Sequence, residues 1–285
     1  MTTDEELRQA IDALGESVLL VGGDPVGESV VARVAGSDIP ATDTADEPDA
    51  VILIADASQA GGDPVSADLS VPSAPVSFAA VLIPERPESG ERTFLTSLTD
   101  AVETVVLVSG ETIDELVDAV TTLVSITRES GVVNVDLADV QTVFELTDVA
   151  TLAVGSDESG DPEVAVRNAF GNVPNGIETD SVSGVIVDVV GTPAMTVGDI
   201  SDAVSTVRRR VGPDAHVIWG GAVDESVEGT LRVRLVLAGV KNVRVAPGDR
   251  CPRCETRLSA YTLDGRTVPS CEACGYAGIS VRLRD

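Results

Sequence analysis

The sequence predicts an α/β protein: a parallel-sheet N-terminal domain, a central helix, a smaller α+β domain with a mixed sheet, and a C-terminal zinc ribbon. Three observations predict this fold class. Continuous apolar runs alternate with helical or loop segments in the first 110 residues, as in parallel sheets covered on both faces. A strongly amphipathic segment follows. Two C-x2-C pairs near the end of the chain have the spacing of a structural zinc site.

The domain boundaries are placed where the character of the chain changes. Residues 1–110 form a degenerate nucleotide-binding-like α/β domain, residues 111–131 the central helix, residues 132–248 the α+β domain, and residues 249–285 the zinc ribbon.

Composition limits the possible functions. The chain has 285 residues, a formal charge of −28 and only 2% aromatic residues, and Lys241 is its only lysine. This acid-rich, lysine-poor composition is similar to that of proteins from extreme halophiles, and it argues against a broad nucleic-acid surface. No signal peptide and no apolar run of membrane-spanning length is present, so we expect a cytoplasmic protein without a membrane span.

The first apolar run, Ser17–Val21, leads into a glycine-containing turn and a helical stretch over residues 30–34. A strand, a glycine-rich turn and a helix can hold phosphate through backbone N–H groups, here with Gly22 and Gly23. However, Asp24 and Glu28 place negative charge in this turn, and Pro25 removes a donor. An ordinary βα turn is therefore the main alternative.

The next strands are expected at residues 50–55, 76–83 and 104–108, with a loop at 36–49 and a helix at 91–101. A second candidate phosphate loop, residues 56–64, follows the first of these strands and contains Gly61 and Gly62. Both candidate loops lie at the carboxyl ends of parallel strands, where such sheets bind ligands.

The central helix is expected to start with the capping box of Thr112 and Glu115, to continue for about 16–18 residues, and to end near Gly131. The segment that follows contains Asn134, Asp136 and Asp139. Asp136 and Asp139 could cap the next helix. The same carboxylates could also orient an attacking water.

The α+β domain is expected to contain strands at 183–190 and 231–239 and a helix at 197–210; the family resemblance described below adds a strand and turn at 151–157, a helix at 163–169 and a strand at 215–220. Residues 231–237 begin with an apolar–polar alternation, which predicts a strand with one solvent-exposed face. His216 and Trp219 are interpreted as residues of core or interface packing rather than of chemistry.

Four cysteines form the pattern C-x2-C-x16-C-x2-C: Cys251, Cys254, Cys271 and Cys274. Four thiolates would hold a structural Zn²⁺ and leave no open position for catalysis. Disulfides are the alternative, which a reducing cytoplasm disfavours. Arginines are frequent in this segment, which fits docking of the ribbon to the acidic face of a partner protein or contact with nucleic acid.

The segment Val132–Val140 resembles the synergy loop of the FtsZ/tubulin superfamily, whose pattern is N-x-D-x-x-D after a long central helix. The elements over residues 130–240 follow the order of FtsZ, and residues 15–110 resemble it loosely. The resemblance implies GTP on the N-terminal sheet of one subunit. It also implies that Asn134, Asp136 and Asp139 act in trans on the nucleotide of a neighbour.

The glycine loops depart from this family. Residues 58–64 read Ser-Gln-Ala-Gly-Gly-Asp-Pro where FtsZ has a G-G-G-T-G-[TS]-G tract, and the segment before the central helix is short. GTP binding is therefore doubtful.

Three functions remain open. The first is a pseudo-GTPase of cell division that interacts with FtsZ-type filament subunits or with itself. The second is an active GTPase that uses backbone N–H groups of Gly22, Gly23, Gly61 and Gly62. The third is a zinc-ribbon adaptor for protein or nucleic acid on an FtsZ-like scaffold.

Overall fold

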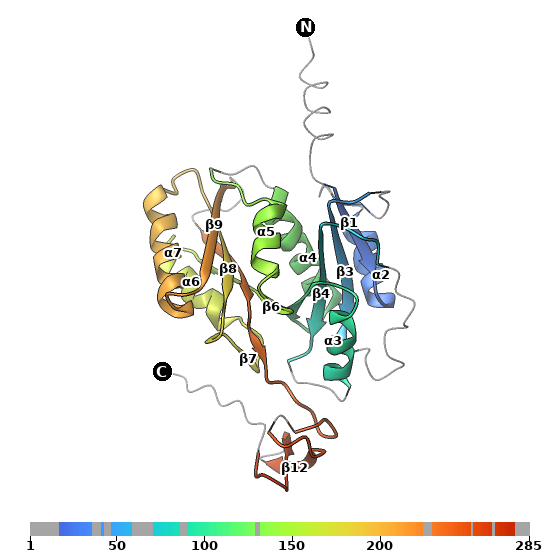
Figure 1. Cartoon of the computed structure of the whole chain (residues 1–285). Coiled ribbons are helices and arrows are strands. Elements are labelled where there is room, and N and C mark those ends of the chain that lie inside the picture. The colour runs from blue at the N-terminus through green and yellow to red at the C-terminus, as the bar shows by residue number, and fades with distance from the viewer. Residues whose placement is uncertain are drawn as a thin grey trace.

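The structure is a computed structural model that describes residues 17–35, 41–42, 47–58, 71–85, 90–128, 132–224, 230–251, 253–263 and 266–276. Its centre is a nine-stranded sheet in the order β2-β1-β3-β4-β5-β6-β10-β8-β9, with helices on both faces and a small C-terminal module beyond the sheet (Figure 1). This α/β architecture confirms the predicted fold class.

Parallel strands form the N-terminal part of the sheet: β1 (Val18–Gly22), β2 (Ala41–Thr42), β3 (Ala50–Asp56), β4 (Val76–Ile83) and β5 (Thr104–Ser109). The apolar runs of the sequence therefore form strands within one or two residues of the expected bounds. One expectation was wrong, because residues 41–42 of the predicted 36–49 loop pair with β1 as a short edge strand.

The second part of the sheet is mixed and contains β6 (Val149–Asp157), β8 (Gly184–Gly191), β9 (His216–Val223) and β10 (Leu231–Ala238). β10 runs antiparallel to β6 and β8, whereas β9 is parallel to β8. β5 and β6 pair only over residues 105–107 and 149–151, and this short contact joins both parts into one sheet. The domain boundaries drawn from the sequence stay a prediction.

In the described part of the chain, three helices cover each face of the sheet. α3 (Glu91–Thr99), α6 (Pro162–Gly171) and α7 (Val197–Val211) pack in one core cluster. α2 (Pro25–Val34), α4 (Ile113–Arg128) and α5 (Leu137–Phe144) pack in the cluster on the other face. α4 is the predicted central helix, and its apolar stripe is buried as its periodicity indicates. Among the described residues, no helix is long and apolar enough to cross a bilayer.

The structure corrects two expectations for the second part of the sheet. β10 has no solvent-exposed face, because it lies between β6 and β8, and of its residues only Arg232 is exposed. Arg234 is buried and pairs with Asp188 on β8, with 2.5 Å between Nε and Oδ2. For His216 and Trp219 the structure excludes the core alternative, since both side chains are exposed on β9, and interface packing stays a prediction.

Two small two-stranded sheets lie outside the main sheet. β7 (Ile177–Glu178) pairs with β11 (Lys241–Asn242), and β12 (Ser259–Leu263) pairs with β13 (Arg266–Ser270). The β12–β13 pair is a hairpin, and the cysteine-containing turns lie directly before and after it.

Candidate functional site

The first candidate phosphate loop connects β1 to α2, and Asp24 fills it. Asp24 is the N-cap of α2, and its Oδ1 accepts the backbone N–H of Gly27 at 2.7 Å. Its Oδ2 accepts the backbone N–H of Asp56, at the end of β3, at 2.7 Å. A carboxylate of the chain itself thus binds donors that an anion at this helix N-terminus would use.

The glycines of this turn allow α2 to approach the sheet closely. A Cβ atom at Gly27 would lie 2.0 Å from the carbonyl oxygen of Ile54, and one at Gly22 would lie 2.5 Å from the backbone nitrogen of Glu28. The N–H of Gly23 donates to the carbonyl of Ile54 at 2.8 Å. Gly22 and Gly27 are therefore required by packing, and the N–H of Gly23 is already used.

The carboxylates near this turn disfavour binding of a further anion there. Burial, reinforced by the nearby carboxylate of Asp56, raises the pKa of Asp24 above its ordinary value, against the effect of its backbone hydrogen bonds. Asp56 is 7% exposed and accepts hydrogen bonds from the backbone and hydroxyl of Ser58. Gly61 and Gly62 of the second candidate loop lie outside the described residues.

Asp136 and Asp139 form a capping box at the start of α5. The N–H of Asp139 donates to Asp136 Oδ1 at 2.9 Å, and the N–H of Asp136 donates to Asp139 Oδ2 at 3.2 Å. The capping interpretation is thus confirmed. Asn134 and Asp136 are exposed and Asp139 is half-buried, so all three lie at the surface next to one another in the chain.

The segment before α5 is held by the sheet. Val132 and Val133 form backbone hydrogen bonds with Gly221 of β9, and the side chain of Val135 lies against Gly220. A Cβ atom at Gly220 would lie 2.9 Å from Val135 Cγ2 and 3.5 Å from Asp188 Oδ1. The Asp188–Arg234 pair therefore lies beneath this segment, a support that the sequence did not reveal.

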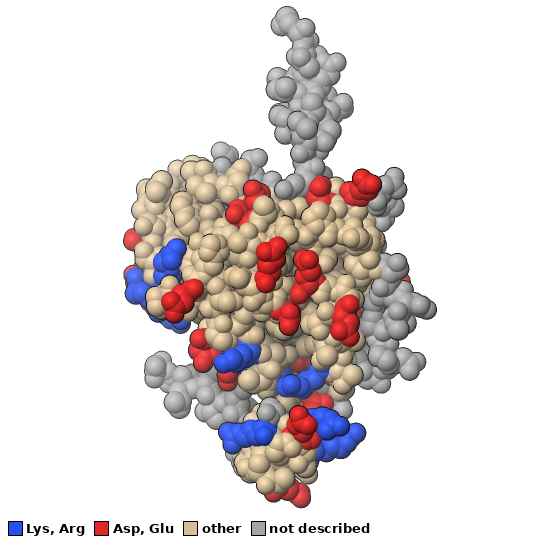
Figure 2. Space-filling model, viewed as in Figure 1, with Lys and Arg blue, Asp and Glu red and all other residues tan. Residues whose placement is uncertain are grey.

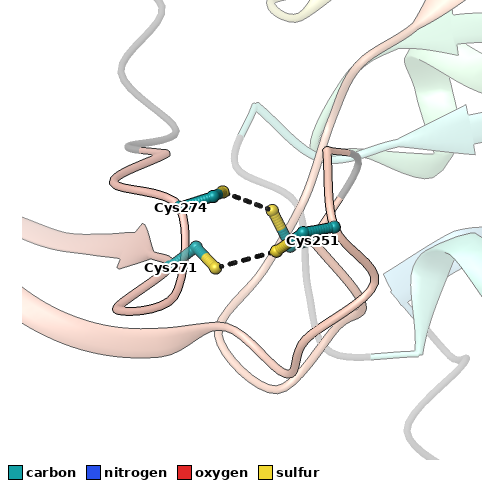
Figure 3. A group of neighbouring side chains, drawn as sticks. Cys251, Cys271 and Cys274 are labelled. Atoms are coloured by element: carbon teal, nitrogen blue, oxygen red, sulfur yellow. Dashed lines mark hydrogen bonds between the residues drawn. The ribbon is translucent and has the colours of Figure 1, made fainter.

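The four cysteines meet as predicted. Their Sγ atoms all lie within 4.8 Å of one another, with 3.6 Å between Cys251 and Cys274 and 3.4 Å between Cys254 and Cys271. The thiols point toward one another from two turns (Figure 3). Tetrahedral coordination with Zn–S bonds of about 2.3 Å places sulfurs about 3.8 Å apart. The donor set could therefore hold a metal ion such as Zn²⁺.

The two cysteine turns have the same hydrogen bonds. In each turn the first cysteine's carbonyl accepts an N–H from the residue after the second cysteine, Glu255 or Gly275, at 2.9 Å. Both of these residues have positive φ, 60° and 72°. The hydrogen bond to the side chain of Thr256 is the main cause that lowers the pKa of Cys254 to about 6, whereas burial and the neighbouring thiols raise the pKa of Cys274 to about 12. Thiolate is the form that binds metal.

A buried ion pair attaches the cysteine module to the sheet, and sequence reasoning missed it. Arg244, just after β11, pairs with Glu91 of α3 at 2.8 Å, and both side chains are 1% exposed. The guanidinium also donates to the carbonyls of Pro84 at 2.5 Å and Asn175 at 2.9 Å. Pro84 follows β4 directly, so the cysteine module is fixed at the carboxyl ends of the parallel strands.

Comparison with known protein families gives one match. Residues 148–241 match the model of the FtsZ family, C-terminal domain. This range begins just before β6 and ends at the start of β11.

One similar relative is "Cell division protein FtsZ 1" of Methanocaldococcus jannaschii, with 34% identity over 128 residues, 45% of this chain and 35% of the relative. The match thus spans about a third of that relative's length. The fold is similar to that of an M. jannaschii FtsZ W319Y mutant, with a TM-score of 0.65, 21% identity and coverage of 84% and 99% of the two chains. It is also similar to a GTPγS-bound protofilament of CetZ2 from Haloferax volcanii, with a TM-score of 0.54, 20% identity and coverage of 78% and 75%.

Proposed function

Because this chain belongs to the FtsZ/tubulin superfamily, we propose that it is a cell-division cytoskeletal protein that acts on filaments without holding a nucleotide itself. The observation that carries this proposal is the position of Asp24, whose carboxylate binds the backbone N–H of Gly27 in the first candidate phosphate loop and that of Asp56 at the end of β3. The proposal has two parts. The N-terminal half is a pseudo-GTPase, and the loop with Asn134, Asp136 and Asp139 acts on a nucleotide that another subunit holds.

The pseudo-GTPase part of the proposal follows because a phosphate and the carboxylate of Asp24 would compete for the same backbone N–H donors. A phosphate at the N-terminus of α2 would have to displace the carboxylate of Asp24, which is covalently present at high effective concentration. It would also approach Asp56 and Glu28, whose charges repel it. Pro25, the first residue of α2, offers no N–H as a replacement.

The in-trans part rests on the surface position of Asn134, Asp136 and Asp139. Carboxylates that orient a water beside a phosphate contribute to hydrolysis wherever the phosphate is bound. The phosphate loop of this chain is filled, so these side chains act on a nucleotide held by another subunit. The capping box orients them, because Asp136 and Asp139 fix each other's backbone.

The cysteine module is a zinc ribbon. Its hydrophobic cluster has only four buried members among the described residues (Val245, Cys251, Leu258 and Cys271), so a bound metal supplies much of its folding free energy. All four coordination positions are thiolates, and the role of the metal is therefore structural. One equivalent of Zn²⁺ per chain by elemental analysis, lost in a Cys271→Ser variant, is the expected result.

Two measurements test the proposal. Isothermal titration of the full chain with GTP should show no micromolar binding, and such binding would contradict the pseudo-GTPase part. Co-sedimentation with an archaeal FtsZ and GTP should recover this chain with the filaments and change their GTP hydrolysis rate. An Asp136→Asn, Asp139→Asn variant that changes hydrolysis as the wild type does would contradict the in-trans part.

A further inference from the structure

In the part of the chain that the structure describes, one edge of β6 has no strand partner over its second half. β5 pairs with this edge only as far as Thr151, whereas β10 pairs with the opposite edge as far as Asp157. The carbonyl of Asp148 accepts an N–H from β5, and the carbonyls of alternate residues in a strand point the same way. The carbonyls of Val154 and Ser156 therefore lie along the part of the edge that β5 leaves open.

Two asparagines at the end of α6 bind these carbonyls. Asn172 Nδ2 donates to the carbonyl of Val154 at 2.8 Å, and Asn168 Nδ2 donates to the carbonyl of Ser156 at 2.9 Å. The helix can approach the strand because Gly155 faces it: a Cβ atom there would lie 2.1 Å from a backbone nitrogen of α6. Each hydrogen bond uses one donor of a carboxamide and fixes its orientation, which leaves Oδ1 and the second N–H for another partner.

The two asparagines line an open groove of about 400 Å³ beside α6. Its other lining residues are Val154, Gly155, Ser156, Arg167 and Gly171. A Cβ atom at Gly171 would have no atom within 4 Å, so there is open space next to this residue. The groove therefore offers oriented carboxamides, a guanidinium and room for a ligand.

The spacing of the carboxamides matches that of an extended peptide. Asn168 and Asn172 are separated by about 6.0 Å along the helix, at about 1.5 Å per residue. An extended chain presents main-chain N–H and C=O groups on one edge at every second residue, about 6.6 Å apart at about 3.3 Å per residue. A carboxamide has an acceptor and donors in one plane, as a peptide group does. Each asparagine can therefore bind the main chain of one residue of an extended segment.

The groove lies beside a cluster of arginines. Arg167 is exposed and lies between Glu163 and Phe170 on one face of α6. Arg209 of α7 pairs with Glu163 at 3.1 Å, and Cζ of Arg210 lies 5.1 Å from the ring centroid of Phe170. These residues carry three positive charges and one negative charge, whereas the whole chain has a formal charge of −28. The local charge favours an acidic ligand.

The figures show the same local excess of cations. In Figure 2, acidic side chains spread over the body of the protein, whereas basic ones gather at the cysteine module, at the adjoining end of the body, and on one side. That side is where Figure 1 shows α6 and α7.

We propose that this groove binds an extended acidic segment of a partner protein. The carboxamides of Asn168 and Asn172 hold its main chain, and Arg167 binds its carboxylates, with Arg209 and Arg210 close by. Main-chain contacts give affinity for an extended conformation, and the arginines select acidic sequences. None of these residues belongs to the phosphate loops, the loop with Asn134–Asp139 or the cysteine cluster. The groove can therefore bind a peptide whether or not the proposed function holds.

Fluorescence anisotropy of the full chain with a labelled peptide, acetyl-Glu-Val-Glu-Val-Glu-Val-amide, tests this proposal at about 0.1 M salt. We expect saturable binding with a Kd below about 1 mM. Replacing both asparagines (N168A, N172A) should weaken binding at least about tenfold, because two main-chain contacts are lost. R167E should weaken it by at least as much, because attraction becomes repulsion. The matched control is R250E, which makes the same charge change in the cysteine module and should leave binding unchanged.

Two further measurements keep the test independent of the stability of the asparagine variants. Gly171→Leu places a side chain in the groove at a position with open space, so it should abolish binding while circular dichroism stays unchanged. In nuclear magnetic resonance spectra, the side-chain amide signals of Asn168 and Asn172 should shift when the peptide is added. The single variants N168A and N172A identify these signals.

Several results would overturn the proposal. These are no saturable binding of the peptide, equal weakening by R167E and R250E, and amide signals of Asn168 and Asn172 that do not shift. A decamer of deoxythymidylate that binds more tightly than the peptide, and loses affinity in R167E but not in N168A, N172A, would assign the arginines to nucleic acid. If the peptide does not bind but Gly171→Leu changes the sedimentation coefficient of the chain, the occupant is a second copy.

Discussion

The carboxylate of Asp24 accepts the backbone N–H of Asp56 across two neighbouring strand ends, at 2.7 Å. The same carboxylate caps α2 through Gly27. One side chain thus closes the space between the loop after β1 and the end of β3, where a phosphate would otherwise contact the backbone.

Asp24→Ala should destabilise the fold more than the loss of an ordinary helix cap does. Loss of a cap costs about 1 kcal/mol, and leaving the N–H of Asp56 unsatisfied adds about 1–3 kcal/mol because that residue is 7% exposed. Urea denaturation measures the difference. Asp161→Ala is the matched control, since Asp161 caps α6 before a proline in the same way but bonds only to its own helix. Equal losses in both variants would show that the contact with Asp56 contributes nothing.

Asp24→Asn should gain stability relative to the wild type as the pH rises from acid. Burial raises the pKa of Asp24, so its stabilising contribution is full below the unfolded pKa of about 3.9 and is lost as the pH rises through the higher folded value. Asparagine does not ionise, so the variant lacks this loss. Denaturation of both proteins from about pH 3 to 7 measures the difference, and a trend of opposite sign would contradict the assigned direction of the shift.

Local patterns in the sequence predicted the elements but not the contacts between them. Thr112 and Glu115 located the start of α4, and the C-x2-C spacing located the cysteine cluster, because both patterns act within a few residues. Asp24 was recognised as a charge that opposes phosphate, whereas its use as an internal acceptor depends on Asp56, 32 residues away.

Local sequence patterns could not predict ion pairs between residues that are far apart in the chain. Arg244 and Glu91 are 153 residues apart, and neither lies in a motif. The apolar–polar alternation that begins at Leu231 predicted a solvent-exposed face, because arginine is usually found at the protein surface. In the structure Arg234 is buried and neutralised by Asp188 on the next strand.

Asp139→Asn should separate the structural from the functional role of the loop. Asparagine retains an acceptor for the N–H of Asp136, so we expect a change in unfolding free energy below about 0.5 kcal/mol. The negative charge is lost, so the effect of the chain on GTP hydrolysis by FtsZ should disappear. Asp199→Asn is the control, because Asp199 completes the same capping box with Thr196 on α7. If both variants affect hydrolysis equally, the carboxylate of Asp139 has no special role.

Arg244→Met should be among the most destabilising single substitutions in the chain. It leaves the carboxylate of Glu91 buried without a cation, at 1% exposure, and removal of one partner from such a pair costs about 3–5 kcal/mol. Arg33→Met provides the contrast, because the Arg33–Asp114 pair is 47% and 74% exposed and such surface pairs are worth about 1 kcal/mol or less.

The double variant Arg244→Met, Glu91→Met completes the cycle. Both charges are then absent, so its loss of stability should be much smaller than the sum of the two single losses. Because Arg244 also binds the carbonyls of Pro84 and Asn175, both Arg244 variants should release the cysteine module from the sheet. Hydrogen exchange over residues 245–251 measures this release: it should rise in both variants and stay unchanged in Arg33→Met. Unchanged exchange in Arg244→Met would mean that contacts of the module itself, rather than this ion pair, hold it at the carboxyl ends of the strands.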